Sequence, residues 1–90
     1  MNCSELIPGD LVIPWEGGIL LMRSIIDYGM ISDNDCVEPG LEALNICLIV
    51  SKIRTRLNTW LFVVSSSGAI GWQYEGNFVS LKRPVWRKAR

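Results

Sequence analysis

Short apolar segments separated by glycine, proline and asparagine make up most of the chain. Five of them predict β-strands, because they are rich in β-branched and aromatic residues and too short for a helix of three turns. These are residues 11–13, 46–53, 60–64, 69–74 and 78–81. A sixth apolar stretch, residues 19–26, is also too short and too β-branched at its end to favour a helix.

The segment around Trp60 is apolar on both of its faces. Trp60, Phe62 and Val64 fall on one face, and Leu61 and Val63 fall on the other. One of these two faces must belong to the core. For Trp60 and Trp72 the pattern favours packing inside the protein over exposure, because a small barrel has little reason to present an indole ring to water.

The length of the chain limits how these strands can pack. Ninety residues form one domain with one core, and 49% of them are hydrophobic while 20% are charged. Five short strands are too few for two well-packed sheets, so a strongly bent small barrel is the economical solution. We therefore expect an all-β, five-stranded barrel over residues 1–81, with a long irregular acidic insertion over residues 27–44 and a basic C-terminal arm over residues 82–90.

The formal net charge of zero hides a strong segregation of charge along the chain. Residues 1–50 carry eight acids and one base, a net charge of −7, whereas residues 51–90 carry one acid and eight bases, a net charge of +7. The two halves either lie against each other in the fold and neutralise, or form a bipolar molecule. A bipolar molecule would stack head to tail or place its basic end on an acidic neighbour.

Residue types that carry chemistry are scarce. There is no histidine, the usual general acid or base at neutral pH. Cys3, Cys36 and Cys47 lack the short spacing of a metal site, so we interpret them as reduced packing residues. The run Asp33-Asn34-Asp35 lacks the correctly placed glycine and closing glutamate of a calcium loop, and Ser65 to Ser67 have no base to activate them. We expect no enzymatic activity, no cofactor and no metal site.

No segment predicts a membrane or secretory role. No apolar run approaches the roughly 18 residues that span a bilayer. The first five residues contain no base ahead of an apolar stretch, so no secretory signal peptide is recognisable. We expect a protein that does not act at a membrane.

The order of these segments resembles SH3-like small barrels over about 60 of the 90 residues, and the match rests on two places, residues 8–12 and 60–81. Residues 8–12, Pro-Gly-Asp-Leu-Val, are similar to the opening turn and first strand of barrels of the KOW and SH3-like kind. Residues 67–72, Ser-Gly-Ala-Ile-Gly-Trp, are similar to the distal hairpin and fourth strand. Residues 75–79, Glu-Gly-Asn-Phe-Val, are similar to the turn entering the last strand. The Ala-Leu-Tyr-Asp-Tyr segment of peptide-binding SH3 domains is absent, so the resemblance implies the barrel and not polyproline recognition.

The same order of motifs is similar to short tailed-phage proteins of the form PGDLV…GxIGW, some of which are parts of the virion. The resemblance implies a non-enzymatic protein–protein interaction module, a small accessory structural protein of a phage virion. Its partners would be other virion proteins or itself, and its location the virion or the cytoplasm of the infected host cell. An alternative of a different kind is a phage-encoded regulator that binds one host protein.

The arm and the acidic insertion are the predicted partner-binding segments. Trp86 lies among the bases of the arm, and tryptophan and arginine are the residues most enriched at interface hot spots. Opposite charges on neighbouring subunits would fix their register. The candidate partner-binding residues are Trp86, Arg83, Arg87 and Arg90 in the arm, and Asp33, Asp35 and Glu38 in the insertion.

Nucleic-acid binding is the second alternative. Lys52, Arg54 and Arg56 would then join the arm in one basic surface, and binding would fall steeply with salt. The sequence pI of about 6.2 argues against this function, because dedicated nucleic-acid-binding domains usually exceed about 9.

Overall fold

The computed structural model describes residues 6–27, 31 and 33–81, which form seven β-strands and two single-turn 3-10 helices. Within these residues, no helix has the length and apolar character needed to cross a membrane. The prediction of an all-β fold is confirmed. The strands are β1 (Leu11–Pro14), β2 (Ile19–Met22), β3 (Cys36–Leu41), β4 (Cys47–Arg54), β5 (Thr59–Ser65), β6 (Ile70–Tyr74) and β7 (Phe78–Ser80), and the 3-10 helices are η1 (Asp33–Asp35) and η2 (Glu75–Asn77).

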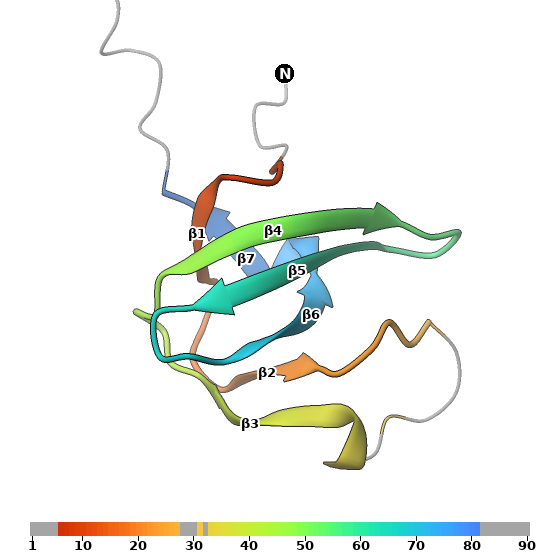
Figure 1. The fold of residues 1–90 in the computed structure, drawn as a ribbon, viewed down its shortest axis with the longest axis horizontal. Coiled ribbons are helices and arrows are strands. Elements are labelled where there is room, and N and C mark those ends of the chain that lie inside the picture. Colours follow the sequence, from red (N-terminus) through yellow and green to blue (C-terminus); the bar gives the residue numbers. More distant parts are fainter. Residues whose placement is uncertain (1–5, 28–30, 32, 82–90) are drawn as a thin grey trace, which may run out of the picture.

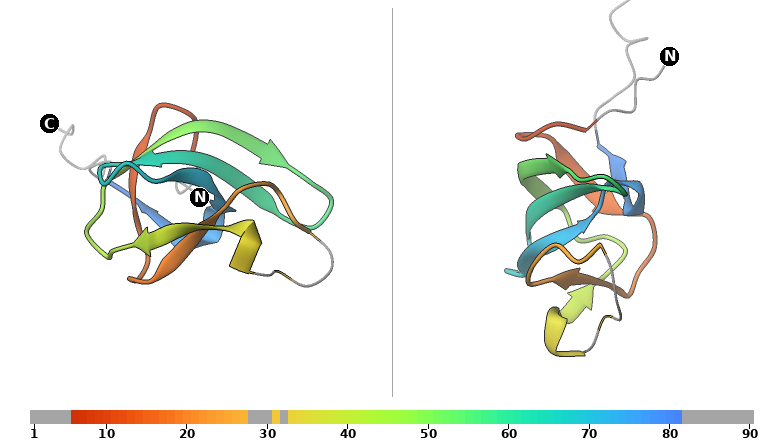
Figure 2. Two further views of the ribbon diagram at one scale, coloured as in Figure 1. Left: turned by 60° about the horizontal axis from the view of Figure 1, so that its bottom comes forward. Right: turned by 90° about the vertical axis from the view of Figure 1, so that its right-hand side faces the viewer.

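All seven strands belong to one antiparallel sheet that curls like part of a barrel (Figure 1). The strand order is β3-β2-β6-β5-β4-β1-β7, so β4, β5 and β6 form a central meander. β1 pairs with β4 on one side and with β7 on the other. Figure 2 shows the curl from two further directions, with β2 and β3 at one end of the sheet and β1 and β7 at the other.

β2 and β3 are not among the five predicted strands. β2 occupies the first half of the apolar stretch at residues 19–26. The expectation of an irregular insertion over residues 27–44 is wrong for residues 36–41, which form β3. β3 contains Pro39 and Gly40, which are typical of turns, but it is an edge strand, where a proline interrupts no inner ladder.

The opening turn has the structure that its sequence predicts. The Asp10 carboxylate accepts a hydrogen bond from the Ile7 N–H at 3.0 Å, and the Asp10 N–H donates to Ile7 O at 3.0 Å. Gly9 adopts a positive φ of 98°, which L side chains rarely adopt. Its N–H donates to Ile49 O at 2.8 Å, so the turn is joined to β4.

The concave side of the curled sheet holds the main core. Leu61 and Val63 are the core-facing residues of β5, and both are fully buried. Cys36 and Cys47 are buried as well, as packing residues should be, and burial raises the pKa of the Cys47 thiol to about 11. Cys3 lies outside the described residues. The core cluster consists of Leu6, Val12, Leu21, Leu41, Cys47, Ile49, Leu61, Val63 and Phe78.

β6 approaches β2 very closely because its inward positions are occupied by Gly71 and Gln73. A Cβ atom at Gly71 would lie 2.7 Å from Leu21 Cβ and 2.8 Å from Met22 O. The buried Gln73 side chain donates through Nε2 to Leu20 O at 2.6 Å. Its Oε1 accepts from Asn77 Nδ2 at 3.0 Å, which fastens η2 to the sheet. The β2–β3 hairpin is therefore held firmly against the meander.

Candidate functional site

The predicted partner-binding residues divide into a described and an undescribed group. Trp86, Arg83, Arg87 and Arg90 lie outside the described residues. Asp33 and Asp35 form the ends of η1, and Glu38 is exposed on β3. Arg23 holds η1 in place, because its backbone N–H donates to Asp35 O at 2.8 Å and its Nε donates to Asn34 O at 3.1 Å.

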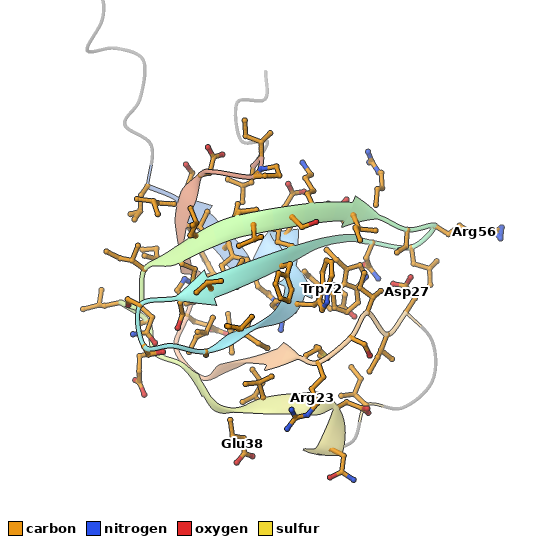
Figure 3. The ribbon with its side chains drawn as sticks, in the orientation of Figure 1. Arg23, Asp27, Glu38, Arg56 and Trp72 are labelled. Atoms are coloured by element: carbon orange, nitrogen blue, oxygen red, sulfur yellow. The ribbon has the colours of Figure 1, made fainter. Side chains whose placement is uncertain are left out.

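The three bases proposed for nucleic-acid binding differ in their contacts. Lys52 Nζ forms an ion pair with Glu75 Oε2 at 3.2 Å and donates to Leu6 O at 2.7 Å. Its charge therefore serves to join β4 to the N-terminal segment and to η2. Arg54 and Arg56 are exposed at the end of β4 and in the turn after it. Figure 3 shows Arg56 at the tip of the β4–β5 hairpin, far from Glu38.

The serine run at residues 65–67 builds a turn. Ser65 Oγ lies 2.6 Å from Ser67 Oγ and accepts hydrogen bonds from the backbone N–H groups of Ser67 and Ala69 at 3.1 Å and 3.2 Å. The turn also contains Gly68 at a positive φ of 96°. The Ser65 hydroxyl therefore has a structural role, which is to hold this turn together.

Four aromatic residues form a second cluster on the outer face of the sheet, opposite to the main core. The ring centroids of Trp60 and Tyr74 lie 4.5 Å apart, and those of Phe62 and Trp72 lie 5.0 Å apart. Trp60 is fully buried, although its face is the outer one. The segment that follows β2 contacts the Trp60 ring through Asp27, which is labelled in Figure 3. Asp27 Oδ1 accepts hydrogen bonds from Trp60 Nε1 at 2.9 Å and from Asn58 Nδ2 at 3.2 Å.

The contact between Asp27 and Trp60 predicts a pH dependence of stability. The hydrogen bond from the Trp60 indole, with smaller ones from Thr55 and Asn58, lowers the pKa of the Asp27 carboxyl below its ordinary value of 3.8. A carboxyl with a lower pKa in the folded state stabilises the fold above its unfolded pKa and loses that contribution as the pH falls. We expect the melting temperature to decrease as the pH falls below about 4, and Asp27→Asn to flatten this decrease.

The pH prediction is measured by thermal unfolding of both proteins between neutral and strongly acid pH. Asn keeps an acceptor oxygen for the indole but does not titrate. Glu16→Gln, at an exposed position between β1 and β2, is the matched control. Equal acid sensitivity of Asp27→Asn and Glu16→Gln would contradict the assigned role of Asp27.

A row of apolar side chains crosses the outer face of the sheet from β7 to β6. The strand registers place Leu11 beside Leu48 and Leu48 beside Val64. They also place Val64 beside Ile70. The Leu81 N–H donates to Leu11 O at 2.9 Å, so Leu81 extends the row past the end of β7. The side chains of antiparallel partners project to the same face of a sheet. We call the five residues the apolar row; in order across the sheet they are Leu81, Leu11, Leu48, Val64 and Ile70.

The apolar row is open to solvent. Four of its five side chains are 41–48% exposed, and Val64 is half-buried. Val50 on β4 and Val79 on β7 adjoin it and are 48% and 39% exposed. We call the row together with these two valines the outer apolar face. It contains no charged residue, and contiguous apolar surface of this kind commonly marks an interaction site.

Two shallow hollows border the outer apolar face at its opposite ends. One, of about 500 Å³, lies along β7 and is lined by Leu6, Trp15, Glu75 and Phe78 among others. Trp15 is 71% exposed at its rim. The other, of about 350 Å³, lies beyond Ile70 and is lined in part by Arg23 and Glu38. Each hollow thus combines an apolar wall with charged side chains, Glu75 at one end of the apolar row and both Arg23 and Glu38 at the other.

Comparison of the chain with protein-family models, with curated proteins and with solved structures found no match. The interpretation of the outer apolar face therefore rests on its own geometry and chemistry. Among the residues that the structure describes, histidine, cysteine and carboxylate side chains do not gather in groups of three or more that could hold a metal ion.

Proposed function

We propose that this chain is a non-enzymatic protein–protein interaction module that binds its partner through the outer apolar face. The observation that carries the proposal is the apolar row, in which five neighbouring cross-strand positions are apolar and four are nearly half exposed. An antiparallel sheet with one solvated face normally alternates apolar inward and polar outward residues. In the apolar row the outward positions are apolar as well, which is typical of a sheet face that another protein covers.

The finer part of the proposal is an SH3-like barrel that serves as a small accessory structural protein of a phage virion. Two features support the barrel type. The first is that the first and last strands, β1 and β7, pair with each other beside a meander of three strands. The second is that a 3-10 turn, η2, leads directly into β7. The virion role is supported by the resemblance of residues 8–12 and 67–72 to short tailed-phage proteins.

The experiment is mass spectrometry of purified particles of the phage that carries this sequence. We expect the chain in the particles at a fixed ratio to the other subunits, and we expect Leu48→Glu to reduce its incorporation, because Glu places a charge in the middle of the apolar row. Leu57→Glu is the matched control, since Leu57 is 55% exposed in the turn after β4, outside the outer apolar face.

Other results would identify a different function. A chain that is abundant in infected cells but missing from particles would point to a regulator that binds a host protein. Salt-sensitive binding to single-stranded DNA that Arg54→Gln and Arg56→Gln weaken, while Leu48→Glu does not, would point to a nucleic-acid-binding barrel. Either result would overturn the proposed virion role.

A further inference from the structure

The outer side of the curled sheet is covered at one end and open at the other. At the covered end, the chain's own segment up to Asp27 shields Trp60 completely. At the open end, the apolar row has the same apolar character, and its exposed residues are solvated to 41–48%. Among the residues that the structure describes, none gives the open end the cover that its chemistry would favour.

The two ends of the apolar row differ in charge. The row begins at Leu81, and the sequence continues directly into an arm with five bases and no acid. It finishes at Ile70, beside the hollow that Arg23 and Glu38 line. The described residues carry eight acids and four bases, a net charge of −4. From the start of β2 to the end of β3 the sequence has four acids, Asp27, Asp33, Asp35 and Glu38, and one base, Arg23, so the β2–β3 hairpin with its connecting segment has a net charge of −3. The row thus runs from a basic end to an acidic end.

We infer that the partner of the outer apolar face is a second copy of this chain, packed face to face with its apolar row running in the opposite direction. The inference rests on the proposed function, because it uses the same face. A two-fold axis perpendicular to the row places the Leu81 end of one copy over the Ile70 end of the other. Each basic arm then meets the acidic hairpin of its partner.

The alternative two-fold arrangement is disfavoured by charge. An axis parallel to the row would place Leu81 on Leu81 and bring together two arms with five positive charges each, and juxtaposed like charges are costly at an interface. A fully extended arm of nine residues reaches at most about 30 Å, which is enough to extend past the row of the partner. Complementary charge therefore selects the antiparallel pairing.

The exposed area of the outer apolar face limits the affinity of the dimer. Six side chains of the outer apolar face are 39–48% exposed. They offer roughly 500 Å² per copy, so a face-to-face pair buries about 1,000 Å² before the arms contribute, close to the lower limit for specific interfaces. We expect a reversible dimer whose affinity depends on the charge contacts and so on salt.

The experiment is sedimentation velocity of the full chain over a range of concentrations, at low salt and at about 1 M salt, where charges more than ~3 Å apart are screened. We expect a dimer with a dissociation constant on the order of 10 µM at low salt, weakened roughly tenfold at high salt. Leu48→Glu should raise the dissociation constant at least about tenfold at both salt concentrations, since the charge would be buried in the interface. Glu38→Lys should raise it at low salt only, since its effect is electrostatic.

Leu57→Glu controls for the added charge and should leave the dimer unchanged. Ile70→Glu is a second variant in the row in case Leu48→Glu disturbs folding, which far-ultraviolet circular dichroism detects. A monomer at every concentration and salt, or equal dissociation constants for Leu48→Glu, Ile70→Glu and Leu57→Glu, would overturn the inference.

A cross-linking experiment tests the direction of pairing. In a Cys3→Ser background, a mixture of Ile70→Cys and Leu81→Cys chains should form a disulfide between the two different variants in preference to either homodimer. Preferential linkage of Leu81→Cys to itself would overturn the antiparallel pairing. The two proposals also fail separately: if wild-type chain is monomeric but Leu48→Glu still abolishes incorporation into particles, the face binds another protein and only the dimer is wrong.

Discussion

Replacement of Trp60 with alanine is expected to lower the free energy of unfolding by about 3–5 kcal/mol, the range for deletion of a large buried aromatic side chain. Trp60 is fully buried, contacts the Tyr74 ring and donates to Asp27 at 2.9 Å. The variant loses apolar contact on the outer face and releases the segment after β2. Since small domains are stable by about 5–15 kcal/mol, this loss is a large part of the total.

The measurement for Trp60→Ala is urea unfolding followed by far-ultraviolet circular dichroism, which does not depend on tryptophan emission. Trp15→Ala is the matched control, because it removes the same side chain at a position that is 71% exposed. Its expected effect is within about 0.5 kcal/mol. A similar loss in the free energy of unfolding for Trp60→Ala and Trp15→Ala would contradict the assignment of Trp60 as a buried residue that stabilises the fold.

Replacement of Gly71 with alanine is expected to lower the free energy of unfolding by about 2–3 kcal/mol, as overpacking of a tight contact does. The added methyl group would meet Leu21 Cβ at 2.7 Å and Met22 O at 2.8 Å. Because Met22 O is a backbone atom, β2 must move away from β6 to make room. Such a shift also strains the hydrogen bond from Gln73 to Leu20 O.

Gly76→Ala is the control for the glycine prediction, with unfolding again measured in urea. Gly76 lies in η2, where an added Cβ would meet no atom within 4 Å, and its φ is not positive. Its substitution should change the free energy of unfolding by less than about 0.5 kcal/mol. An equal loss at both glycines would indicate a general backbone effect in place of the close approach of β2 to β6.

The candidate site could be predicted only in part from the sequence. The sequence predicts Glu38 as a partner-binding residue from its charge, and the structure places it, exposed, in the hollow beside Ile70 at one end of the apolar row. The sequence also groups Lys52 with Arg54 and Arg56, because the three bases are close together in the chain. The structure instead pairs Lys52 with Glu75, 23 positions away, and that pairing depends on how β4 and η2 meet in space.

The apolar row itself was not predicted, although part of its signal is visible. Leu48 and Val50 alternate with the buried Cys47 and Ile49, so β4 is apolar on both faces. A fully buried strand shows the same pattern. Whether the second face is covered depends on other segments: the face is covered at Trp60 and open at Leu48.

The sequence by itself determined the features that depend on neighbouring residues. Strand formation at residues 60–64 and 69–74 follows from β-branched and aromatic residues around the turn with Gly68, and the opening turn follows from Gly9 and Asp10. The tertiary structure alone decided which outer positions are covered, where the acids and bases lie, and that residues 36–41 form a strand. Those properties arise from pairing between segments far apart in the chain, where registers and close approaches are set by the packing of the whole sheet.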